Sequence, residues 1–80
     1  MTNIEKYDLI FMEVFSVGKE VLNRDFEKTN VDKWDSVRQL NLISSIEEAF
    51  DIMLDTEELL GLSSYDIGRE ILSKYGITFD

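Results

Sequence analysis

Trp34-Asp35-Ser36-Val37 stands at the start of a helical pattern that continues over residues 36–51. An aspartate or a serine directly before a segment with helical apolar spacing is typical of an N-cap. Its side-chain oxygen can accept a hydrogen bond from a backbone N–H that has no partner within the helix. The pattern therefore predicts a helix over about 36–51, with Asp35 or Ser36 as the cap.

The residues of this helix divide into two faces at about 100° per residue. The face expected to enter the core carries Leu42, Ile43, Ile46, Ala49, Phe50 and, just beyond the helix, Met53. The opposite face and its flank carry Val37, Leu40, Asn41, Ser44, Glu47 and Glu48. Val37 and Leu40 are thus apolar side chains that point away from the core, beside Ser36. Scattered exposed apolar residues are common, but this grouping favours a docking face for a partner protein.

The remaining segments predict three further helices and one long loop. Thr2 and Glu5 have the spacing of a capping box before a helix over about 3–17, and Gly18 is its expected stop. Shorter patterns predict helices over about 56–61 and 64–75, the latter capped by Ser63.

Between the first two helices, residues 18–35 have no clear period and predict a loop that is long for a compact domain, with a short helical turn near 20–23 as the alternative. Val21, Phe26 and Val31 are expected to pin this loop to the bundle, and Trp34 to anchor it. The predicted fold is therefore all-α, a single domain over 1–80, with four helices in an up-down bundle and a short third helix.

Composition excludes several classes of function. The 80 residues include 17 acidic and 8 basic side chains, which give a net charge of −9. That balance opposes nucleic acids and anionic lipid surfaces and favours partners with basic patches, although acidic charge also serves solubility alone. The chain has no cysteine and no histidine, and no apolar run is long enough for a membrane span. A cytoplasmic monomer without a metal site is expected. The carboxylates Asp51, Asp55, Glu57 and Glu58 lack the spacing of a calcium loop.

Ser36 is the candidate functional residue. A serine at a helix start is most often only a cap, but this one follows a long loop and an aspartate and precedes outward apolar residues. Free N–H groups and the helix dipole favour an anion at this position by about 0.3–1 kcal/mol. With no histidine as a base and no G-x-S-x-G turn, the serine cannot act as a catalytic nucleophile. We therefore interpret Ser36 as an attachment point for a phosphate-linked group that another enzyme adds.

At these residues the chain resembles the acyl carrier proteins and the related peptidyl and D-alanyl carriers. The resemblance is most specific at Asp35-Ser36-Val37, which is similar to the D-S-L motif of that family. It continues through Leu42-Ile43-Ser44-Ser45-Ile46-Glu47-Glu48-Ala49-Phe50 and covers most of the chain. The sequence departs from the housekeeping fatty-acid carrier at Val37, where leucine is usual, and at Arg38, where an acid is common.

The resemblance implies a function. Ser36 would carry 4′-phosphopantetheine, donated by coenzyme A through a phosphopantetheinyl transferase that recognises Asp35. The thiol of this arm would hold an acyl or aminoacyl group as a thioester. Partner enzymes, meaning a loading ligase and downstream synthases or transferases, would contact Val37, Leu40, Glu47 and Glu48. The protein itself would not be an enzyme. The rival hypothesis is an acidic helical adaptor in which Ser36 is only a cap.

Overall fold

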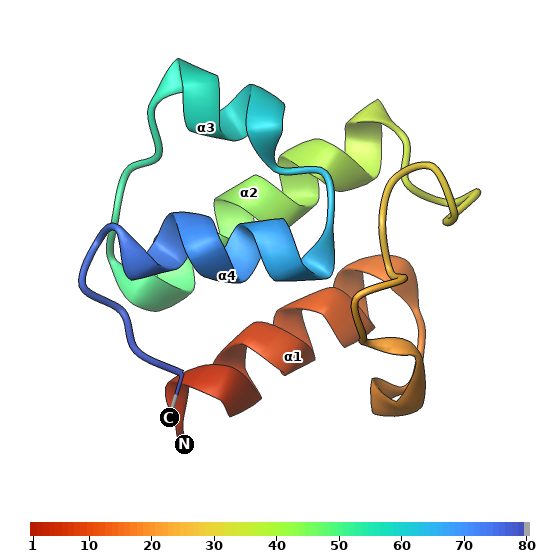
Figure 1. The fold of residues 1–80 in the computed structure, drawn as a ribbon, viewed down its shortest axis with the longest axis horizontal. Coiled ribbons are helices and arrows are strands. Elements are labelled where there is room, and N and C mark those ends of the chain that lie inside the picture. Colours follow the sequence, from red (N-terminus) through yellow and green to blue (C-terminus); the bar gives the residue numbers. More distant parts are fainter. Residues whose placement is uncertain (80) are drawn as a thin grey trace.

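A computed structural model describes residues 1–79 and contains four α-helices (Figure 1). Within this range the only extended pairing is a single antiparallel bridge between Glu27 and Ser64. The elements are α1 (Asn3–Phe15), a 3₁₀ turn (Lys19–Val21), α2 (Ser36–Phe50), α3 (Thr56–Gly61) and α4 (Tyr65–Ser73). The all-α, four-helix class expected from the sequence is confirmed, with α3 the shortest α-helix. None of the helices in residues 1–79 is long and apolar enough to cross a membrane.

The two longest helices end with the same turn, at a non-glycine residue. Thr2 and Glu5 form the expected capping box at the start of α1. Its end differs from the expectation, because Ser16 rather than Gly18 takes the left-handed conformation, with φ 55°. The next N–H, that of Val17, then bonds back to the Met12 carbonyl at 3.1 Å, which closes the helix at Phe15 rather than at residue 17.

Asp51 does the same at the end of α2, with φ 52°, so that helix closes at Phe50. This turn also explains a second difference from the sequence pattern. Met53 was expected on the core face, but its side chain is 84% exposed, because the helical period cannot continue through a left-handed residue. Leu54 enters the core instead. Ala49 is exposed as well, so the buried stripe of α2 ends at Ile46.

The start of α4 also differs by one residue from the expectation. Ser64, not Ser63, is the cap, and its hydroxyl accepts a hydrogen bond of 3.0 Å from the Ile67 N–H. The Ser63 carbonyl instead accepts from the Lys28 N–H at 2.8 Å, a contact with the long loop that sequence periodicity does not reveal. The helix ends at Ser73, two residues before the expected end.

An aromatic cluster forms the centre of the core. Phe11 of α1 lies at its middle, with the ring centroids of five other aromatic residues between 4.9 and 6.1 Å from its own. These five are Tyr7, Phe15, Phe26, Trp34 and Tyr65. All six are buried. The cluster joins α1, the long loop and α4, so the loop is part of the core rather than an appendage.

The long loop is held in place by both side chains and backbone. Phe26 and Trp34 bury more than nine-tenths of their surface, and the Tyr65 N–H donates to the Phe26 carbonyl at 2.9 Å. Val31 is half-buried, as a pinning residue should be. Val21 was expected to pin the loop but is 40% exposed, because it lies in the 3₁₀ turn, close to the helical turn that was the alternative for this segment.

Two buried tyrosines link α1 to α4 and predict a dependence of stability on pH. The Tyr7 hydroxyl donates to the Tyr65 carbonyl at 2.6 Å, and the Tyr65 hydroxyl donates to the buried carboxylate of Asp8. Burial raises the pKa of Tyr7 well above the usual value of 10.0. Burial, followed by the hydrogen bond to Asp8, raises the pKa of Tyr65. Both hydroxyls therefore keep their protons in the folded state at pH values where they would lose them in the unfolded chain.

This stabilisation is complete below about pH 10 and is lost as the pH rises toward the folded-state pKa values. Above pH 10 the free energy of unfolding is expected to fall by about 1.4 kcal/mol per pH unit for each of Tyr7 and Tyr65. Urea unfolding at successive pH values from 8 upward measures this slope. The variant Tyr65→Phe should show a shallower fall than the parent. A free energy of unfolding that stays constant above pH 10 would contradict the assignment.

Candidate functional site

Ser36 is the first residue of α2, and its hydroxyl is not used to cap the helix. Asp35 is the cap, and its Oδ1 accepts a hydrogen bond of 2.9 Å from the Arg38 N–H. Ser36 is exposed, and within residues 1–79 its hydroxyl makes no hydrogen bond. The sequence left open whether Asp35 or Ser36 caps the helix. The structure assigns that role to Asp35, which leaves a free hydroxyl at the positive end of the helix dipole.

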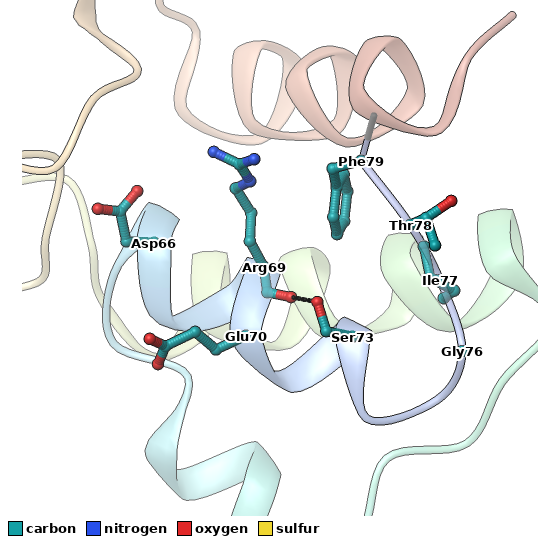
Figure 2. Close-up of a pocket in the computed structure, with 8 residues that line it drawn as sticks. All are labelled: Asp66, Arg69, Glu70, Ser73, Gly76, Ile77, Thr78 and Phe79. Atoms are coloured by element: carbon teal, nitrogen blue, oxygen red, sulfur yellow. Dashed lines mark hydrogen bonds between the residues drawn. The ribbon is translucent and has the colours of Figure 1, made fainter.

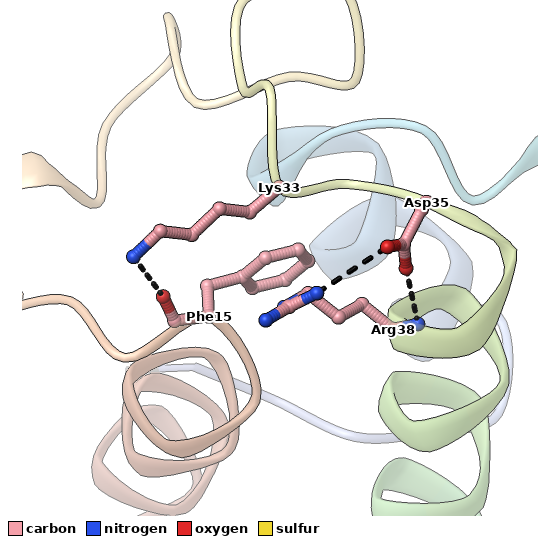
Figure 3. A network of polar contacts seen from close by, with 4 residues as sticks. All are labelled: Phe15, Lys33, Asp35 and Arg38. Carbon is pink, nitrogen blue, oxygen red and sulfur yellow. Dashed lines mark hydrogen bonds and ion pairs between the residues drawn. The ribbon is translucent and has the colours of Figure 1, made fainter.

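Asp35 and Arg38, which flank Ser36 in sequence, form an ion pair at the start of α2 (Figure 3). Arg38 Nη1 is 3.3 Å from Asp35 Oδ2, so the aspartate holds both the backbone and the side chain of the same arginine. Figure 3 also shows Lys33, whose Nζ lies 3.5 Å from the Phe15 carbonyl at the end of α1. The last turn of α1 has no basic residue of its own. Lys33 therefore provides a cation for the negative end of its dipole.

Gln39 connects the serine-bearing turn to α3, a role that the sequence analysis missed. Its Oε1 accepts from the indole N–H of Trp34, and its Nε2 donates to the Leu59 and Leu62 carbonyls at 3.1 and 2.9 Å. The indole is buried, which confirms Trp34 as a loop anchor. The sequence offered only a glutamine five residues after the single tryptophan, and partners 20 and 23 residues away leave no local pattern.

Removing this side chain is expected to loosen α3. No residue of α3 is fully buried and the helix has six residues, too few to be stable without tertiary contacts. Gln39→Ala would leave the Trp34 N–H and two carbonyls without partners, at a cost of about 1–3 kcal/mol. Urea unfolding and amide hydrogen exchange in α3 measure the effect, with Asn41→Ala, an exposed position on the same helix, as the control. Equal exchange rates in the two variants would show that Gln39 does not hold α3.

The outward face of α2 is exposed as its periodicity indicated, with one difference. Val37 and Leu40 are 65% and 66% exposed, and Glu48 is exposed as well. Glu47 is only half-buried, because its Oε2 accepts a hydrogen bond of 2.9 Å from the Leu54 N–H and so fixes the connection to α3. Within residues 1–79, Glu47 therefore has a structural hydrogen bond that Glu48 does not have.

Charge is distributed unevenly along the chain. Residues 39–68 contain seven acidic and no basic side chains, so most of the net charge of −9 resides in α2, α3 and the start of α4. Arg38 is the last cation before this segment and Arg69 the first after it. A partner that approaches the outward face of α2 therefore meets a strongly negative field interrupted near Ser36 by one arginine.

A shallow pocket lies between α4 and the C-terminal segment (Figure 2). Its lining residues are Asp66, Arg69, Glu70, Ser73, Gly76, Ile77, Thr78 and Phe79. Arg69 stacks over the ring of Phe79 at 5.3 Å, and the Ser73 hydroxyl donates to the Arg69 carbonyl at 2.9 Å. None of the candidate residues from the sequence lies here.

No protein-family model and no curated protein matches the sequence. Among solved structures, the fold matches that of holo acyl carrier protein from Geobacter metallireducens, with a TM-score of 0.68 and 29% sequence identity. The match covers 94% of this chain and 91% of that one. The chain thus has the fold of that acyl carrier protein and is similar to it over nearly its whole length.

Proposed function

We propose that this protein carries acyl or aminoacyl groups as thioesters on a 4′-phosphopantetheine arm attached to Ser36. The observation that carries the proposal is the exposed hydroxyl of Ser36. This hydroxyl does not cap the helix, because Asp35 does. A serine that only capped the helix would use its oxygen for a backbone N–H. Support also comes from the similar acyl carrier protein of known structure, which was solved in its holo form.

The residues around Ser36 fit a phosphodiester. The backbone N–H groups of the first turn of α2 and the dipole of this 15-residue helix favour a negative group at its start. Arg38 adds a positive charge to this first turn, although its side chain runs toward the end of α1 and pairs with Asp35 (Figure 3). Asp35 is an anion, but its carboxylate is engaged by Arg38, which reduces its repulsion of a second negative group.

The chain supplies only the acceptor hydroxyl for attachment. Ser36 Oγ would attack the pantetheine-bearing phosphorus of coenzyme A, and the bond to the adenylate phosphate would break. Adenosine 3′,5′-bisphosphate would leave, and the hydroxyl proton would pass to a base on the transferase. The sequence has no histidine to act as that base. Once attached, the arm supplies the thiol that a chain without cysteine lacks.

Partner enzymes are proposed to dock on the outward face of α2. Val37 and Leu40 offer apolar contacts beside Ser36, and Glu48 offers a free carboxylate farther along the same face. Glu47 belongs to this face in the sequence pattern, but its bond to the Leu54 N–H gives it a smaller share in docking. The seven acidic side chains within residues 39–68 favour transferases, ligases and synthases whose docking surfaces are basic.

The absence of cysteine gives a direct test of loading. The unmodified protein has no thiol, so it should not react with a thiol-specific reagent such as dithionitrobenzoate. After incubation with coenzyme A, Mg²⁺ and a broad-specificity phosphopantetheinyl transferase, followed by removal of small molecules, we expect one reactive thiol per chain. A sample incubated without the transferase is the control. A folded protein that gains no thiol would contradict the proposal.

A further inference from the structure

A groove with an apolar floor lies between the end of α1 and the long loop. Its apolar lining residues are Val17, Val21, Phe26 and Val31, and its volume is about 520 Å³. Phe26 is buried at the bottom, Val17 and Val31 are half-buried, and Val21 is exposed. A groove of this volume is within the range that binds small molecules. Val21 is thus an apolar side chain that the core does not use and that the groove presents at the surface.

Contacts within the loop hold the walls of this groove in place. The Val31 N–H donates to the Glu27 carbonyl at 3.0 Å, and the Asn30 side chain donates to the Asp25 carbonyl at 3.0 Å. The floor is fixed as well, because the ring of Phe26 belongs to the aromatic cluster of the core. A ligand that enters a preformed groove does not have to order a flexible loop, which would lower its affinity.

The groove lies within reach of an arm on Ser36. Lys33 lines the groove and precedes Ser36 by three residues, so their Cα atoms are at most about 11 Å apart. The arm has about a dozen chain atoms between its phosphate and its sulfur, the length of about four extended residues or about 13 Å. Its single bonds let it bend toward the groove whichever way the exposed hydroxyl points. Attachment also raises the effective concentration of the carried group at the groove.

We infer that this groove binds the carried group, and that the group is an apolar acyl chain rather than a polar aminoacyl group. The inference rests on the proposed function, since it requires Ser36 to be loaded. Each CH₂ group that moves from water to the apolar floor favours the bound state by about fourfold, whereas a charged ammonium group is disfavoured there. The pocket beside α4 is lined by the charged Asp66, Arg69 and Glu70 and suits an alkyl chain less.

The test compares octanoyl-loaded with acetyl-loaded protein, both made from the acyl-coenzyme A with Mg²⁺ and a broad-specificity phosphopantetheinyl transferase. We expect the octanoyl form to melt about 4–8 °C above the acetyl form, the effect of a chain that is bound about tenfold more often than free. Isotope-filtered NMR spectra of the octanoyl form show where the chain lies. Its terminal methyl group should give nuclear Overhauser effects to the methyl groups of Val21 and Val31.

Matched variants separate the groove from other apolar surfaces. Val21→Asp places a charge in the groove at a position that is 40% exposed, and it should remove the difference in melting temperature. Leu9→Asp, at a position on α1 that is 38% exposed and outside the groove lining, should keep that difference.

The outcomes distinguish this inference from the proposed function. Equal melting temperatures of fully loaded octanoyl and acetyl forms would overturn the groove as the site of the carried group and leave loading at Ser36 standing. Overhauser effects to a core residue such as Ile46, instead of Val21, would do the same, and this measurement on the parent protein does not depend on any variant. No loading of the folded protein with either acyl group would overturn both.

Discussion

Replacing Ser36 by alanine is expected to abolish loading completely and to leave the fold intact. In the proposed function the hydroxyl oxygen of Ser36 is the atom that bonds to the arm, so no partial loading should remain without it. The stability should change by less than about 0.5 kcal/mol, because Asp35 rather than Ser36 caps α2 and the side chain of Ser36 is exposed. Loading with coenzyme A, followed by mass and thiol measurements, checks the first part. Urea unfolding checks the second.

The chain contains a matched control for this variant at the start of α3. Asp55 caps that helix by accepting from the Glu58 N–H at 2.9 Å, and Thr56 follows it as an exposed first helical residue. Thr56→Ala thus removes a hydroxyl from the same kind of position, directly after a capping aspartate. It should load as the parent protein does. Loading lost in both variants would point to a general requirement for helix starts, and loading retained in Ser36→Ala would exclude Ser36 as the site.

Two helical glycines are expected to respond in opposite ways to replacement by alanine. A Cβ at Gly68 in α4 would lie 2.1 Å from the Tyr7 hydroxyl oxygen and 2.9 Å from Leu62 Cδ1. The tyrosine cannot easily move, because its hydroxyl donates to the Tyr65 carbonyl at 2.6 Å inside the core. Gly68→Ala should therefore destabilise the protein by about 1–3 kcal/mol, despite the higher helix propensity of alanine.

Gly61 in α3 gives the contrasting case. A Cβ there would meet no atom within 4 Å, so Gly61→Ala should stabilise the protein by about 0.4–1 kcal/mol through lower entropy of the unfolded chain. An 80-residue domain has a total stability of about 4–12 kcal/mol, so the difference between the two variants is a large share of it. Urea unfolding measures both. Gly68→Ala at or above the parent's stability would show that α1 and α4 pack less closely than described.

Much of the fold could be predicted because its main determinants are periodic. The spacing of Tyr7, Phe11 and Phe15 places one aromatic face on α1, and that face is buried. The same reasoning places Leu42 and Ile46 of α2 in the core. The starts of α1 and α2 could also be predicted, because the side-chain oxygens of Thr2 and Asp35 can accept hydrogen bonds from the first backbone N–H groups of a helix.

The features that could not be predicted depend on contacts between distant residues. Ser16 and Asp51 adopt the left-handed conformation, which glycine favours on intrinsic grounds, because the next N–H in each case bonds back into the helix. Asp8 is 5% exposed and accepts from Tyr65, a residue 57 positions away. No local spacing signals that a carboxylate on a helix will be buried, because the compensating donor comes from another helix.

Some features of the candidate site could likewise be predicted from the sequence, and others could not. Asp35 and Ser36 could be identified from a helix start, and the exposure of Val37 and Leu40 from helical phase. The sequence could not decide which of Asp35 and Ser36 is the cap, since both side chains carry a suitable oxygen. Nor could it show that Arg38 turns back to Asp35 or that Gln39 reaches α3, because long side chains can take many directions from one backbone position.

The central claim is that Ser36 is covalently modified, and the intact mass of the protein tests it most directly. The parent protein and Ser36→Ala would be weighed before and after incubation with coenzyme A, Mg²⁺ and a broad-specificity phosphopantetheinyl transferase. We predict that the parent gains the mass of one 4′-phosphopantetheine and that the variant gains nothing. A folded parent protein that gains no mass would contradict the claim and leave an acidic helical adaptor with the fold of a carrier.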